Sequence, residues 1–402
     1  MVGHLGTAEL GGLAVAATII VTGYSLFIFL AYGTTGSVAR LLGAGDTRRA
    51  AHMAVQGLWL ALGIGVALAL LGAVFAEALV GAIGAEGEVR RHALTYLRIS
   101  LFGVPSLMLT LAGTGYLRGL QDTRTPLVVA IGSNIVNLVL ELALIYGFGF
   151  GIGASALATV VAQTGAAAVY VAIVLRAVRA EEAALRPDGG ALRRLVRVSV
   201  DLFVRTAALR AALLVATAVA TRLGTIDLGA HQVAFEIWNF LALALDAIAI
   251  AGQALTGRYL GAGDVDAARA AARRMITWGL VGGVGVGLAI GALSPLLPHA
   301  FSSDDDVIAL AGFLLLFVAA FQPVNGVVFV LDGVLIGAGD LTFLAKAMVL
   351  AAVVFVPAAG AVLWADLGIG ALWGAIGLLM LVRFLALGWR FRSGAWAIPG
   401  AG

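Results

Sequence analysis

A series of long apolar segments, each close to the length needed to cross a bilayer, limits the folds that are open to this chain. Eleven of them are separated by short polar joints, at residues 12–33, 54–80, 96–117, 126–148, 153–175, 199–221, 230–256, 276–297, 308–337, 342–364 and 368–388. A helix needs about 20 mostly apolar residues to span the hydrocarbon core. Only 12% of the 402 residues are charged, whereas a soluble domain is about a quarter charged. We therefore expect an all-α polytopic membrane protein with about eleven spans.

The uneven distribution of basic residues predicts the orientation of the spans. The loops on one side hold the six arginines of 176–198 together with Arg40, Arg48, Arg49, Arg118, Arg124, Arg258, Arg269, Arg273, Arg274, Arg390 and Arg392. The loops on the other side hold Arg90, Arg91 and Arg222, with almost nothing else that is basic in the last half of the chain. We expect the protein to lie in the plasma membrane with its arginine-rich loops on the cytoplasmic side. The polar stretch at 176–198 and the C-terminus then lie in the cytoplasm.

Several classes of function are excluded or unsupported. The net charge of +3 gives no support for nucleic-acid binding, and the absence of cysteine excludes disulfides and thiolate-ligated metals. The five histidines are scattered without the spacing of metal ligands. No GxxxxGK[ST] loop indicates nucleotide-driven pumping. We expect no enzyme and no metal or other cofactor.

The chain also contains an internal repeat. Matching features lie 218 residues apart (223 − 5 = 218; 260 − 42 = 218): LGTAELG and LGTIDLG from Leu5 and Leu223, LGAGD from Leu42 and Leu260, GYLRGLQD and GVLIGAGD from Gly115 and Gly333, and the mid-span prolines Pro105 and Pro323. Several matches at one offset indicate a duplicated membrane domain. We expect an N-terminal bundle at 1–177, a cytoplasmic linker at 178–198 and a C-terminal bundle at 199–402.

The repeat makes the number of spans itself informative. A parallel repeat requires an even number of spans per half, but the first half has five and the second has six. The counterpart of the span at 199–222 would fall at −19 to 4, since 199 − 218 = −19. We therefore expect a six-plus-six plan whose first helix is missing from this sequence, with a true eleven-span variant as the alternative.

Several motifs together resemble the multidrug and toxic compound extrusion (MATE) transporters, in particular their DinF-type branch. They are GHLGTAELGGLAVA, TTGSVARLLGAGD, GYLRGLQDTRTPL, NIVNLVLELALIYGFGFGIGASALATVVAQ, DLFVRTAALR and AFEIWNFLALALDAIAIAGQALTGRYLGAGD. The resemblance covers nearly the whole chain. It implies two six-helix bundles related by a pseudo-twofold axis along the membrane normal, in agreement with the parallel repeat.

Ionisable side chains within spans are costly, and they are the first candidates for function. Asn137 and Glu141 lie one helical turn apart and share a face. The resemblance implies that Asn137, Glu141 and Thr159 form a cation-coupling site, with Glu141 standing where the family pattern has aspartate. An aspartate of the first helix, also implied, would precede Met1. The alternative is a structural carboxyl that bonds Asn137.

The second half offers a further set of candidates for the substrate cavity or for a charge network: Glu236, Asp246, Asp332, Arg205 and Arg210. The spacing of Asp201 and Arg205 predicts an ion pair, and Asp332 and Asp246 fit the DinF-type pattern. Helix packing and gating are the alternative roles. Pro105 and Pro323 interrupt their spans and are candidate bending points or, alternatively, inherited kinks.

The leading hypothesis is a monomeric secondary antiporter that exports an organic, cationic or amphipathic compound in exchange for H⁺ or Na⁺. One alternative is a flippase for a lipid-linked precursor, which would need a cationic cavity and for which Arg98, Arg205 and Arg210 are candidates. The other is an inactive product of a truncated reading frame.

Overall fold

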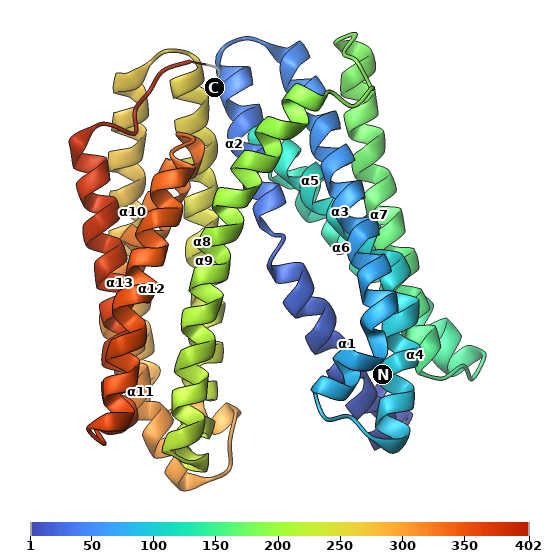
Figure 1. The fold of residues 1–402 in the computed structure, drawn as a ribbon, viewed down its shortest axis with the longest axis vertical. Helices are drawn as coiled ribbons and strands as arrows, with labels where there is room; N and C mark the ends of the chain where they lie inside the picture. Colours follow the sequence, from blue (N-terminus) through green and yellow to red (C-terminus); the bar gives the residue numbers. More distant parts are fainter. Residues whose placement is uncertain (1, 401–402) are drawn as a thin grey trace. The chain divides into compact units, whose positions relative to one another are not determined.

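The computed structural model describes residues 2–400, and every regular element in that range is a helix (Figure 1). Within residues 2–400, eleven helical segments are long and apolar enough to cross a membrane, which confirms the predicted number and the all-α fold. Two of these segments are each divided by a short turn, between α1 and α2 and at the 3₁₀ turn Leu101–Gly103 between α4 and α5, so the labels run to thirteen. The helices are α1 (Thr7–Ser25), α2 (Phe29–Gly43), α3 (Thr47–Ala82), α4 (Gly87–Ser100), α5 (Val104–Gly119), α6 (Arg124–Glu141), α7 (Ile152–Ala180), α8 (Gly189–Leu223), α9 (Thr225–Gly261), α10 (Val265–Leu293), α11 (Asp305–Gly337), α12 (Leu341–Trp364) and α13 (Gly368–Ser393).

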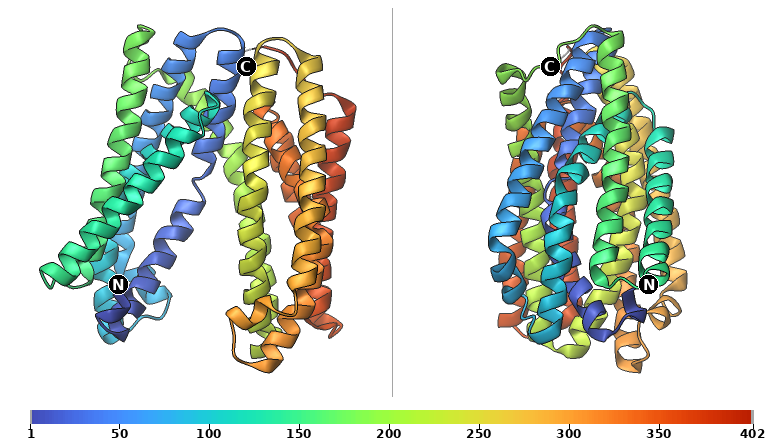
Figure 2. Two further views of the ribbon diagram at one scale, coloured as in Figure 1. Left: turned by 180° about the vertical axis from the view of Figure 1, so that it is seen from behind. Right: turned by 90° about the vertical axis from the view of Figure 1, so that its right-hand side faces the viewer.

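The helices form two compact units. One comprises Met1–Val38 and Asp46–Ser199, and the other comprises Ala39–Gly45 and Val200–Gly402. In the first unit α1 packs on α4, α3 packs on α5, and α7 contacts α4, α5 and α6. In the second unit α11 packs between α9 and α10 and also contacts α13, which in turn packs on α12. The neighbouring courses of α9 and α10 can be followed in Figure 2.

The same turn and helix cap occur twice in the chain, 218 residues apart. Gly45 and Gly263 have φ angles of +76° and +79°, in the left-handed region that glycine tolerates. In each case the next residue, Asp46 or Asp264, caps a helix: its carboxylate accepts a hydrogen bond of 2.9 Å from the backbone nitrogen three residues later. The two LGAGD motifs therefore end one helix and begin the next in the same way.

The two LGAGD motifs also contact each other within the second unit. A Cβ atom on Gly43 would lie 1.9 Å from the carbonyl oxygen of Arg258, and one on Gly261 would lie 1.9 Å from the carbonyl oxygen of Arg40. Arg40 and Arg258 are 218 residues apart, as are the two glycines. The contact is thus reciprocal between the repeats, and only glycine permits the close approach of the two backbones.

Helix packing within each unit follows the repeat as well. A Cβ added to Gly333 would lie 2.1 Å from the carbonyl oxygen of Ala249. A Cβ added to Gly115 would lie 2.5 Å from the carbonyl oxygen of Ala31. Backbone atoms cannot move aside as a side-chain end can. These two glycines therefore set the distance between neighbouring helices in their units.

We expect Gly333→Ala to destabilise the protein by about 1–3 kcal/mol, because the added methyl group overpacks a helix contact. The measurement is the thermal melting temperature of the purified protein in detergent. Gly285→Ala is the matched control, since nothing lies within 4 Å of a Cβ at this position on α10, and it should melt at or above the wild-type temperature. Equal melting temperatures for Gly333→Ala and the wild type would contradict the packing argument.

The polar stretch expected as a linker is partly helical. α8 begins at Gly189, so its first ten residues lie within the predicted linker, where arginine, leucine and alanine favour helix. The loop before α8 is bound to α3. Trp59 donates to the carbonyl of Leu185 at 3.0 Å, and the Gln56 amide bonds the backbone of Arg186 at 3.0 Å and of Asp188 at 2.9 Å. Backbone hydrogen bonds, the first from Gly190, hold the pKa of the Asp188 carboxyl below its usual value.

The two units differ at one pair of repeat-related helices. α6 has no buried residue, whereas α12 buries nine. In the second unit α8 lies beside α12, where the Thr342 hydroxyl donates to Asp201 at 2.7 Å. Among residues 2–400, no helix of the first unit is related to α8 by the repeat.

Candidate functional site

Polar side chains of α6 and α7 meet in the first unit. The Asn137 amide nitrogen donates a hydrogen bond of 3.2 Å to the Thr159 hydroxyl. The Ser155 hydroxyl donates to a carboxylate oxygen of Glu141, and the Thr159 hydroxyl donates to the Ser155 carbonyl at 3.0 Å. The structure thus brings together the three residues that were predicted to couple a cation, and it adds Ser155. We call Asn137, Glu141, Ser155 and Thr159 the α6–α7 cluster.

The local structure explains why these side chains converge. Asn137 and Glu141 are one turn apart on α6, and Ser155 and Thr159 are one turn apart on α7, so each pair projects from one face of its helix. Glu141 is the last residue of α6 before a π-helical turn at Leu142–Gly147. Such turns are rare, and they are frequent at functional sites.

Tyr96 of α4 completes this region. It is 8% exposed and belongs to the core cluster of the first unit. Its hydroxyl lies against the side chains of Thr159 and Ser155, and the Glu141 carboxylate is close enough to act on it electrostatically. Sequence reasoning missed both Ser155 and Tyr96. The position of Ser155, one turn before Thr159, was a usable signal, whereas nothing in the sequence singles out Tyr96.

The chemistry of the α6–α7 cluster suits a proton or a monovalent cation. Within residues 2–400 Glu141 forms no salt bridge with a basic side chain, and no group of three or more His, Cys, Asp or Glu could hold a metal ion. A single carboxylate with hydroxyl and amide oxygens nearby offers oxygen ligands and one negative charge. Ionisable side chains within membrane spans are candidates for function, and Glu141 is the candidate in this unit.

A second polar cluster lies in the second unit. Asp332 of α11 accepts hydrogen bonds from Arg205 of α8 and from Arg383 of α13, the latter at 2.5 Å. Asp332 and Arg383 are 4% and 3% exposed. Two guanidinium groups thus converge on one buried carboxylate, and we call Arg205, Asp332 and Arg383 the Asp332 cluster. Arg383 was missed from the sequence, although it is the one basic residue within the last predicted span.

The other predicted charged residues of the second unit lie on α8 and α9. Asp201, which was expected to pair with Arg205, accepts a hydrogen bond from Thr342. Glu236 and Arg210 are exposed, and no contact within residues 2–400 joins them to the Asp332 cluster. Asp246 is half-buried on α9, one turn before the Ala249–Gly333 contact.

The two candidate bending prolines differ in their surroundings. Pro105 lies in the first turn of α5, directly after a 3₁₀ turn that ends α4. Pro323 lies inside α11, which continues as a single helix to Gly337. Both pack against a glycine: a Cβ on Gly65 would meet Pro105 at 2.6 Å, and one on Gly283 would meet Pro323 at 3.0 Å.

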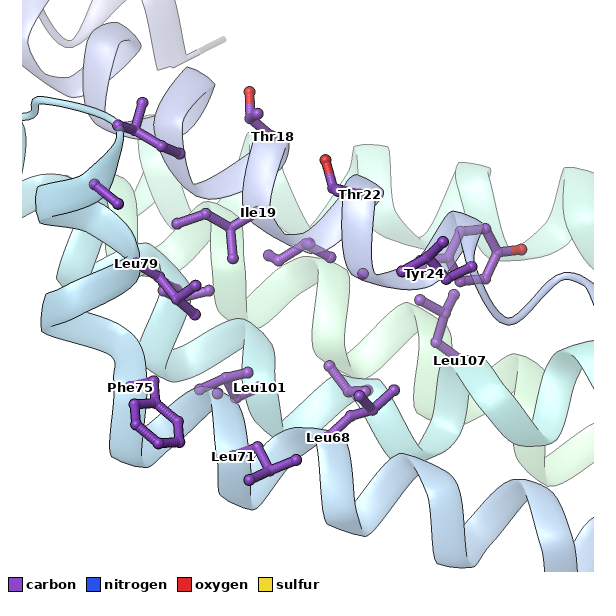
Figure 3. Close-up of a pocket in the computed structure, with 18 of the residues that line it drawn as sticks. Thr18, Ile19, Thr22, Tyr24, Leu68, Leu71, Phe75, Leu79, Leu101 and Leu107 are labelled. Atoms are coloured by element: carbon purple, nitrogen blue, oxygen red, sulfur yellow. The ribbon is translucent and has the colours of Figure 1, made fainter. Parts of the chain in front are cut away.

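An apolar cavity of about 650 Å³ lies in the first unit between α1, α3 and the α4–α5 segment (Figure 3). Leu68, Leu71 and Phe75 line it from α3, and Thr18 and Thr22 lie on the α1 side with their hydroxyls directed away from those apolar side chains. Pockets for organic ligands commonly have this size and are mostly apolar.

Comparison with known proteins gives consistent matches. The MatE family model matches residues 1–143 and 204–359. The DNA damage-inducible protein F of Escherichia coli is 32% identical over 98% of this chain and 88% of its own length. A probable multidrug resistance protein NorM of Rhizobium meliloti is 29% identical over 97% of this chain and 87% of its own length.

A solved structure supports the fold. The crystal structure of a MATE transporter in the bent conformation superposes with a TM-score of 0.88 at 22% identity, covering 99% of this chain and 89% of that one. The family match extends over both units and includes the residues of the α6–α7 cluster on α6. The chain therefore belongs to the MatE family, a family of multidrug efflux transporters.

Proposed function

We propose that this protein is a secondary active antiporter, which exports organic compounds in exchange for H⁺ or Na⁺ by alternating access of two bundles. The observation that carries the proposal is Glu141, a half-buried carboxylate in a membrane span with hydroxyl neighbours and no basic partner within residues 2–400. Such a group is costly in a membrane span unless a proton or cation neutralises it.

Neutralisation of Glu141 provides a means of coupling. A proton or Na⁺ that enters from outside removes the unpaired negative charge of the α6–α7 cluster. Coupling to transport requires the ion and the substrate to differ in their affinity for the inward-open and outward-open states. The two ligands then favour opposite states, so that release of one accompanies binding of the other.

The exported substrate is proposed to be amphipathic or cationic. The apolar cavity of the first unit provides space for a drug-sized compound, with polar side chains confined to one side. We further propose that the protein acts as a monomer in the plasma membrane, with the α7–α8 loop and the C-terminus in the cytoplasm, as the distribution of arginine predicts.

Ion-driven efflux from proteoliposomes tests this function. Ethidium, a fluorescent organic cation, is loaded into the vesicles, and an inward proton or Na⁺ gradient is then imposed separately. We expect one gradient to accelerate ethidium efflux and its collapse by an ionophore to abolish the acceleration. Efflux that responds to neither gradient, together with scrambling of a fluorescent lipid, would contradict antiport and favour the flippase.

A further inference from the structure

A groove in the second unit has polar groups at one end and apolar side chains along the rest. It has a volume of about 490 Å³ and lies between α8 and α12. Asp201 of α8 and Thr342 and Lys346 of α12 form the polar end, and Val349, Leu350 and Val353 continue the groove along α12. We call it the α8–α12 groove. It shares no residue with the α6–α7 cluster, the Asp332 cluster or the cavity of the first unit.

The apolar part of the groove opens to the outside of the protein. Val349, Leu350 and Val353 are 40%, 52% and 61% exposed. Both α8 and α12 are long and apolar enough to cross a membrane, so exposed apolar side chains on them can contact acyl chains. From Thr342 to Val353 the helix rises about 16 Å at 1.5 Å per residue. The groove therefore runs from near the end of the span at Leu341 into the hydrocarbon region.

The polar end carries one charge of each sign. Lys346 is the only lysine of the chain, and within residues 2–400 its ammonium group forms no hydrogen bond or salt bridge. The Asp201 carboxylate accepts one hydrogen bond, from Thr342, and is half-buried at the same end. A carboxylate has about four lone-pair sites, so Asp201 retains acceptor capacity.

We propose that the α8–α12 groove binds a phospholipid with a phosphoethanolamine head group. Lys346 binds the phosphate, and the Asp201 carboxylate accepts hydrogen bonds from the primary ammonium group, while an acyl chain lies along Val349, Leu350 and Val353. A choline head group has no N–H to donate to Asp201, and the carboxylate repels a lipid of net negative charge. The charge pair thus selects the zwitterionic amine lipid.

Lipid selection can be measured with the purified full-length chain. Spin-labelled phosphatidylethanolamine, phosphatidylcholine and phosphatidylglycerol are compared by their association with the protein in mixed vesicles, and co-purifying lipid is identified by native mass spectrometry. We expect a preference of about fivefold for phosphatidylethanolamine, since one interfacial charge contributes about 1 kcal/mol. Lys346→Ala and Asp201→Asn should each remove that preference.

Two further variants keep the test decisive. Leu350→Trp fills the apolar part of the groove without changing a charge, and it should reduce the retained phosphatidylethanolamine. Arg48→Ala removes a basic residue from the first unit and should leave the preference unchanged. Equal association of the three lipids with the wild type, a preference for phosphatidylglycerol, or a preference that survives in Lys346→Ala and Leu350→Trp would each overturn the proposal.

Discussion

Glu141→Gln is expected to abolish ion-driven efflux, with a loss of at least about tenfold under an imposed gradient. Glutamine keeps the size of the side chain and can still accept the hydrogen bond from Ser155. It cannot change its charge when the ion binds or leaves, so the ion loses its differential affinity for the two states of the transporter. The rate of ethidium efflux from proteoliposomes measures the effect.

Two companion variants show whether the loss belongs to the carboxylate. Glu86→Gln removes an exposed carboxylate before α4 and should leave efflux unchanged. Thr159→Ala removes the hydroxyl that accepts from Asn137. It should reduce coupled efflux by about two- to tenfold, the equivalent of one hydrogen bond. Full coupled activity in Glu141→Gln would exclude Glu141 as the coupling residue.

Asp332→Asn is expected to have the largest effect on stability. The substitution removes the negative charge that Arg205 and Arg383 contact, and Arg383 is almost completely buried. Breaking a buried charge pair from one side costs about 3–5 kcal/mol, because an uncompensated charge stays inside. We expect a large decrease in the melting temperature of the purified protein.

A triple variant shows whether Asp332→Asn loses stability through the unpaired charge or through changed packing. Asp332→Leu combined with Arg205→Met and Arg383→Met removes all three charges at once, and it should recover most of the stability that Asp332→Asn loses. Asp305→Asn, at the exposed start of α11, is the matched control and should melt with the wild type. If Asp332→Asn and the wild type have the same melting temperature, the Asp332 cluster does not stabilise the second unit.

The repeat made much of the fold predictable from the sequence. The 218-residue offset between short motifs predicts which helices and turns are equivalent in the two halves. The structure has equivalent contacts at this offset, because Gly115 packs against Ala31 and Gly333 packs against Ala249. Motifs that contain glycine are informative because they mark close backbone approaches. The start of α8 was less predictable, since Gly189 can either break a helix or begin one.

The α6–α7 cluster was predictable in part. Helical spacing and family resemblance together located Asn137, Glu141 and Thr159. Tyr96 was not predictable, and the pairing of Arg383 with Asp332 was not either, because each contact joins two different helices and the register between helices is set by packing. For the same reason the spacing of Asp201 and Arg205 on one helix did not reveal that Thr342 and Asp332 lie beside them.

Reversing the driving force tests directly whether Glu141 couples an ion to the substrate. Because coupling between two ligands is reciprocal, an imposed ethidium gradient should drive H⁺ or Na⁺ in the opposite direction, recorded with a pH- or Na⁺-sensitive dye inside the vesicles. We expect ion movement in the wild type and none above background in Glu141→Gln. Ion movement of equal size in both proteins, or none in the wild type, would contradict this role of Glu141.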